Sequence, residues 1–122
     1  MYTVIRFAYA GGAEAKLIGA GERINQLVPG AFRGIRKAGD GFAVELAADV
    51  PWAEHQRELA KFITTAGTAV KDLVADGFRV IVDTAIEPRD YTGKGVAVVA
   101  LDSGLLSALV DAGIEFELSV YG

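Results

Sequence analysis

The chain has 122 residues, of which 52% are hydrophobic and 23% charged, and its formal net charge is −4. These values are typical of a folded domain and exclude a disordered chain, which is poor in aliphatic residues. The chain has no cysteine and one histidine, His55, which excludes disulfides, thiol nucleophiles and metal sites built from thiolates or several histidines. The length predicts a single globular domain over residues 1–122.

The N-terminal part is expected to contain one strand and one short helix. Alternating aromatic and β-branched residues predict a strand over 2–9. Residues 13–18 fit either a short strand or the start of a helix, and Gly19 and Gly21 are expected to break the chain. Apolar residues at helical spacing then predict a short helix over 22–28, which a Pro-Gly pair ends.

A glycine-rich stretch over 30–41 is expected to be a loop that contains a short strand. It carries the longest basic cluster of the chain, Arg33, Arg36 and Lys37, which we interpret as a solvated loop. Three phosphate contacts give weak nonspecific binding at most, so no nucleic-acid partner is expected. An Asp-Gly turn signal then precedes a strand over 42–46.

The longest helix is expected to begin near Pro51, which suits a first turn, and to end at Gly77. Asp49 is its candidate cap, and Gly67 weakens it by about 1 kcal/mol and points to a close packing contact. Trp52 is expected to anchor the start of the helix. The apolar stripe keeps helical spacing for about six turns and consists of Trp52, Leu59, Phe62, Ile63, Ala66, Val70, Leu73 and Val74.

The C-terminal part is expected to alternate strands with one short helix. Residues 78–87 alternate as a clean strand, and 88–95 form a polar loop. Residues 96–101 are uniformly apolar, as in a strand at the centre of a sheet. A helix over 103–111, capped by an Asp or Ser, and a half-exposed strand over 114–120 complete the chain.

The order of these elements predicts an α+β fold, in which one long and two short helices pack on a mostly antiparallel sheet. The run from Val96 to Tyr121 resembles the end of an uncharacterised small bacterial domain family: an apolar strand, a short helix with paired leucines and an alternating strand that ends in Tyr. The Trp-led helix and the segment 22–40 are similar to that family too, whereas 10–21 departs from it. Some relatives resemble immunity proteins that neutralise toxins, so the resemblance implies the fold and a binding role, and it transfers no catalytic residue.

Carboxylates are the remaining pool for acid–base chemistry or charge recognition. Asp83 and Glu87 share one face of their strand, roughly 13 Å apart along an extended chain, and Glu115 and Glu117 share a face roughly 7 Å apart. If the two strands adjoin, these residues form a negative patch around Arg79. The candidate partner-binding residues are Arg79, Asp83, Glu87, Asp90, Tyr91, Glu115 and Glu117.

Other motifs are incomplete. His55 has no legible catalytic partner, and we interpret it as structural. The glycines near residue 20 lack the third glycine and the acidic residue of a dinucleotide site, and no serine has the setting of a nucleophile. No catalytic residue, metal site or cofactor is therefore predicted.

The leading hypothesis is a non-enzymatic module of immunity or inhibitor type, which occludes a protein partner with a basic surface. A phage-encoded inhibitor of a host defence complex is an alternative, because it also acts by occlusion. The other alternative is a small-molecule-binding or carboxylate-dependent enzyme domain that uses Asp83, Arg79 and Tyr91 in a pocket between sheet and helices. Without a signal peptide or membrane span, a cytoplasmic location is expected, and an exposed sheet edge leaves a homo-oligomer open.

Overall fold

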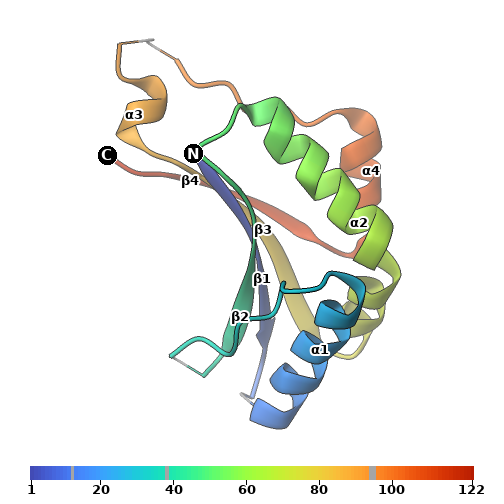
Figure 1. Ribbon diagram of the computed structural model, residues 1–122. Helices are drawn as coiled ribbons and strands as arrows, with labels where there is room; N and C mark the ends of the chain where they lie inside the picture. Colours follow the sequence, from blue (N-terminus) through green and yellow to red (C-terminus); the bar gives the residue numbers. More distant parts are fainter. Residues whose placement is uncertain (12, 38, 94–95) are drawn as a thin grey trace.

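The computed structural model of the chain describes residues 1–11, 13–37, 39–93 and 96–122. Four strands form one sheet in the order β2 (Gly41–Ala48), β1 (Tyr2–Tyr9), β3 (Phe78–Ile86) and β4 (Glu115–Val120). The first three strands pair antiparallel, and β4 pairs parallel with β3. The helices α1 (Glu14–Leu27), α2 (Trp52–Ala75) and α4 (Ser103–Ala112) cover one face of the sheet (Figure 1). The α+β class with a mostly antiparallel sheet is thus confirmed.

The core lies between this face and the helices. Alternation along β1 buries Ile5 and Phe7, and the Phe7 ring stacks on Phe42 of β2 with centroids 4.7 Å apart. Burial of apolar side chains from both layers supplies most of the stabilisation of such a fold. Every residue of β3 except Arg79 is buried, which follows from its inner position, with β1 on one side and β4 on the other.

The helix α1 is longer than the sequence suggested. It runs through Gly19 and Gly21 without interruption, so the expected break there was wrong, and the short helix over 22–28 is its second half. A contact with a distant residue explains why position 21 is a glycine. The Phe32 ring lies where a side chain would project, and an added Cβ would come within 2.6 Å of Phe32 Cγ. No short strand is found among the described residues of the loop over 30–41.

The long helix α2 and its end near Gly77 are confirmed, although two details differ. Asp49 does not cap the helix; it has φ 58° and pairs with Arg89 instead. The space around Gly67 is open, since an added Cβ would meet only Ile63 of the same helix, at 3.4 Å, so the expected packing contact was wrong. Trp52 stacks on His55, with ring centroids 5.6 Å apart.

The connection from β3 to β4 differs most from the predicted elements. Residues 96–101 are not a strand: they pair with no described strand, and Val96 and Val98 are 67% and 69% exposed. The Trp52 indole instead donates to Ala100 O at 2.7 Å. The short helix α3 (Pro88–Tyr91), which was not expected, starts this connection; the predicted loop over 88–95 also includes residues 94 and 95, which lie outside the described part.

The last helix and strand follow the prediction closely. Asp102 caps α4 by accepting a hydrogen bond from Leu105 N at 2.7 Å, and Gly113 ends the helix with φ 73°. The chain then returns as β4, parallel to β3. Both termini lie at the same end of the sheet as α3 (Figure 1).

Candidate functional site

The sheet face opposite the helices is the candidate site, and we call it the open face. Figure 1 shows no helix over this face within the described chain. Because successive side chains in a strand point to opposite sides, the register assigns its members. They are Tyr2, Val4, Arg6 and Ala8 on β1, Ala43 and Glu45 on β2, Arg79, Ile81, Asp83 and Ala85 on β3, and Glu115, Glu117 and Ser119 on β4. Glu87 and Tyr121 follow directly after β3 and β4.

Charged side chains from three strands meet over the centre of the open face. Asp83 of β3 lies opposite Glu117 of β4, and Arg6 of β1 approaches both carboxylates, at 3.7 Å and 3.1 Å. Asp83 also accepts a hydrogen bond from Ser119 Oγ at 2.9 Å. One arginine therefore holds together the buried carboxylate of Asp83 on β3 and the half-exposed carboxylate of Glu117 on β4.

A second pair lies at the beginning of β4. Arg79 donates to Glu115 from Nε at 2.7 Å and from Nη2 at 3.2 Å, so the contact is bidentate. This hydrogen-bonded guanidinium holds the pKa of Glu115 below its usual value. The pair is exposed, and such pairs contribute little to stability. Its geometry instead fixes where the two charges are presented.

Tyrosines border the other end of the open face. The pKa of Tyr2 is raised, first by its hydrogen bond with Tyr121, then by burial and by nearby negative charge. Tyr121 is half exposed, so an aromatic ring is available beside the carboxylates.

The helix α3 lies at this end of the sheet, and the predicted site residues Asp90 and Tyr91 form hydrogen bonds that fix its position. The Asp90 carboxylate accepts a hydrogen bond from the Met1 amino group at 2.8 Å and another from Glu87 N at 2.8 Å. These two donors hold the pKa of Asp90 below its usual value. Tyr91 donates its hydroxyl to Tyr121 O at 3.0 Å. Asp90 and Tyr91 thus position α3 between the two ends of the chain.

The structure brings four predicted site residues together on the open face, namely Arg79, Asp83, Glu115 and Glu117, because β3 and β4 are neighbours. Glu87 lies just past the end of β3, where it begins α3 and pairs with Arg89. Arg6 was missed. The alternating pattern of the first strand already placed Arg6 on this face. Its contact with Asp83 and Glu117 could not be predicted, because it depends on the order of the strands in the sheet.

Glu115 of the open face does not match the acid of a glycosidase-type pair. A glycosidase-type pair needs one carboxyl group with a raised pKa in a cleft, whereas the pKa of Glu115 is lowered by Arg79. Within residues 1–11, 13–37, 39–93 and 96–122, no group of three or more His, Asp or Glu side chains is arranged to hold a metal ion.

His55 lies in the core and not at a site. Its Nε2 donates to Val50 O at 3.0 Å, so in the neutral ring Nδ1 accepts from Thr3 Oγ1 at 2.9 Å. Thr84 Oγ1 completes the chain at 3.0 Å from Thr3 Oγ1. Burial lowers the pKa of His55, which keeps the ring neutral. These contacts support the structural interpretation of His55.

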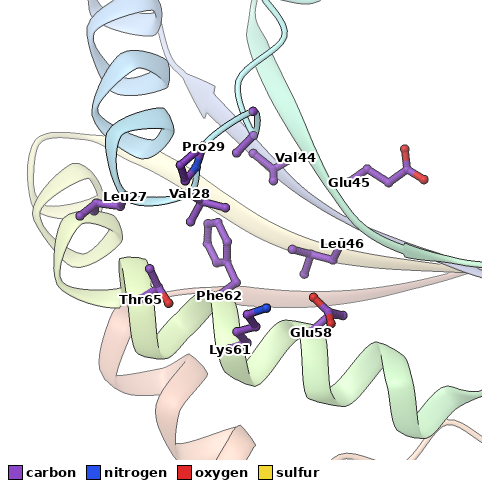
Figure 2. A pocket seen from close by; sticks show the side chains of 12 residues that line it. Leu27, Val28, Pro29, Val44, Glu45, Leu46, Glu58, Lys61, Phe62 and Thr65 are labelled. Carbon is purple, nitrogen blue, oxygen red and sulfur yellow. The ribbon is translucent and has the colours of Figure 1, made fainter.

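A pocket of about 300 Å³ lies between the end of α1, β2 and α2 (Figure 2). Phe62 of α2 points into it, and Glu58 and Lys61 of α2 border it. Its volume is at the lower end of the range for small-molecule sites. The enzyme alternative named Asp83, Arg79 and Tyr91 for a pocket between sheet and helices; none of them lines this one, because the first two lie on the open face and the third on α3.

Comparisons with protein-family models, with curated proteins and with solved structures each return no match. The resemblance noted from the sequence therefore stays a prediction. No helix in the described chain is long and apolar enough to cross a membrane.

Proposed function

We propose that this chain is a non-enzymatic binding module of inhibitor or immunity type, which uses the open face to cover a basic surface of a protein partner. The observation that carries the proposal is the composition of that face. On the strands, four carboxylates (Glu45, Asp83, Glu115 and Glu117) share it with two arginines (Arg6 and Arg79). Beyond the strands, Glu87 pairs with Arg89, and Arg33 lines a hollow beside Glu45. Negative potential over a broad surface steers a basic partner and orients it.

The internal ion pairs suit recognition by preorganisation. Arg6 and Arg79 hold the carboxylates in fixed positions before a partner arrives, which lowers the entropy cost of ordering them on binding. Tyr121 supplies an exposed aromatic ring at the border, the type of residue that often dominates binding energy. Occlusion requires no catalytic group, so an immunity protein and a phage-encoded inhibitor would both act in this way.

The test is capture from a lysate of the native host by the immobilised chain, followed by binding kinetics with the purified partner. The open-face variant is Glu115→Lys with Glu117→Lys, and the matched control reverses the same number of charges, with Glu14→Lys and Glu22→Lys at exposed positions of α1. We expect a basic protein that the wild-type chain and the control retain. For the open-face variant we expect an on-rate lower by about tenfold or more, and for the wild-type chain an on-rate that falls as salt is raised. Retention of no protein at low salt, or equal binding by the open-face variant, would contradict the proposal.

The pocket in Figure 2 supports one second candidate, a binding site for a small apolar ligand. Thermal shift against a metabolite panel tests it, with Phe62→Ala as the variant that removes the central side chain of the pocket. A ligand that stabilises the wild-type chain but not this variant would favour that candidate. A panel without any stabilising ligand would count against it.

A further inference from the structure

The two outer edges of the sheet differ in how they are protected. At the edge of β2, residues 28–31 lie close to the strand, because they line a pocket together with Val44, Glu45 and Leu46. The pairing of β2 with β1 is also interrupted by a register shift between Thr3 and Val4. Flanking segments and irregular pairing are the usual protections of an edge strand. The pairing of β4 with β3 is regular from Glu115 to Val120, and among the described residues no segment makes a backbone hydrogen bond along the outer edge of β4.

The backbone of β4 shows which groups this edge presents. Tyr121 N donates to Ile86 O of β3 at 2.9 Å, so Tyr121 directs its backbone groups toward β3. Backbone groups alternate in direction along a strand, which turns those of Phe116, Leu118 and Val120 outward. Among the described residues, no other segment makes a backbone hydrogen bond with these three.

The side chains at this edge are apolar on the helix side. Leu118 is 46% exposed and Val120 is 64% exposed. On α4, the helix that precedes β4, Leu106 and Val110 are also exposed and lie one helical turn apart. An unpaired strand edge with exposed aliphatic residues is a template for another strand.

We propose that β4 pairs antiparallel with β4 of a second copy of this chain, with Leu118 of the two copies facing each other on the twofold axis. In this register Phe116 of each copy faces Val120 of the other. Each of the three residues with outward backbone groups then faces a residue of the second copy whose backbone groups also point outward. Every outward donor and acceptor of β4 is therefore satisfied. On the helix side, the contacts are aliphatic or aromatic throughout.

The charges of β4 select this register. On the open face it places Glu117 opposite Ser119 of the second copy, and Glu115 opposite Tyr121. Centring the pairing on Glu117 instead would place the two Glu117 carboxylates directly opposite each other, which destabilises a strand pair. Centring it on Ser119 would leave the outward groups of Phe116 without a partner within β4. A shift by a single residue would place apolar side chains opposite charged ones.

The resulting dimer has one continuous sheet of eight strands. An axis perpendicular to the sheet keeps the helices of both copies on one side and the two open faces on the other. The proposal does not depend on the protein-binding function, because it rests on β4 alone.

Light scattering of the wild-type chain at about 0.1 mM tests the association, with twice the monomer mass of 12.8 kDa as the expected result. The edge variant is Leu118→Lys, which places two like charges on the axis. The matched control is Leu27→Lys, because Leu27 has a similar exposure of 42% but lies at the end of α1. We expect the edge variant to weaken dimerisation by at least about tenfold and the control to leave it unchanged. A monomeric wild-type chain, or equal dimerisation of both variants, would overturn the proposal.

Amide exchange followed by NMR tests the register directly. In the wild-type dimer the amides of Phe116, Leu118 and Val120 are expected to be protected along with those of Glu117 and Ser119. In the Leu118→Lys monomer only Glu117 and Ser119, which point toward β3, should keep protection. Equal exchange at Phe116 and Val120 in both proteins would overturn the proposal.

A cross-link provides a test that does not require the edge to be disrupted. The chain has no cysteine, so Leu118→Cys introduces the only thiol. Hydrogen-bonded antiparallel residues have Cα atoms about 5.5 Å apart, a separation that a disulfide spans. Oxidation of Leu118→Cys should give a covalent dimer faster than oxidation of Leu27→Cys, and equal rates would overturn the proposal.

Discussion

Two glycines of α1 should respond in opposite ways to the same substitution. Gly19 and Gly21 both lie inside the helix, where alanine is favoured over glycine by about 1 kcal/mol. An added Cβ at position 19 would meet nothing within 4 Å, so Gly19→Ala should stabilise the chain by about this amount. At position 21 the same methyl group would overlap the Phe32 ring.

The cost at position 21 follows from the position of that ring. The added Cβ would approach three of its atoms, including Cγ at 2.6 Å, which is close to the backbone and cannot rotate away. Overpacking of this kind costs about 1–3 kcal/mol, and the upper end applies because Phe32 also packs edge-to-face on Phe42 at 5.1 Å. After the gain in helix propensity, Gly21→Ala should destabilise the chain by roughly 2 kcal/mol. The two variants should thus differ by roughly 3 kcal/mol.

Urea unfolding of both variants measures the difference, and a thermal scan should separate their midpoints by roughly 12 °C. Phe32→Ala in the Gly21→Ala background provides the control, because removal of the ring removes the overlap. The effects of Gly21→Ala and Phe32→Ala should therefore be non-additive by more than about 1 kcal/mol. Equal stability of Gly19→Ala and Gly21→Ala, or full additivity with Phe32→Ala, would refute this account of the packing.

Three further predictions concern the core and α2. The lowered pKa of His55 means that the unfolded chain binds the His proton more readily, so stability should fall as the pH decreases below about 6.5, by at most about 1.4 kcal/mol per pH unit. Urea unfolding between about pH 5 and 8 measures this dependence of the free energy of unfolding on pH. His55→Gln should lack the contribution of His55 to that slope, and identical slopes for both proteins would contradict the prediction. Thr3→Val should cost about 1–3 kcal/mol in the same assay, because it removes the donor to His55 Nδ1, and a neutral effect would show that this hydrogen bond is not needed. Gly67→Ala should stabilise α2 by about 1 kcal/mol, since the nearest atom to the new Cβ is 3.4 Å away; a lower unfolding midpoint would show a packing constraint.

Most elements were predictable from the sequence because their signals are local. The stripe along α2 and the alternation in β1 and β3 depend only on residues a few positions apart. Asp102 begins α4 as its cap and Gly113 ends the helix, for equally local reasons. These patterns were sufficient for the α+β class, because each amphipathic element must cover an apolar face.

Long-range contacts decided the rest. The unbroken course of α1 through Gly21 depends on Phe32, eleven positions later in the chain, which packs against the bare backbone. The apolar run over 96–101 has the composition of a strand, but composition does not show whether a neighbouring edge is available, and β3 already has β1 and β4 beside it. The open face depends on the same strand order, because only the parallel pairing of β3 with β4 places Asp83 next to Glu117 and within reach of Arg6. Local periodicity thus determined which residues face inward, and the pairing of distant strands determined which charges meet on the outside.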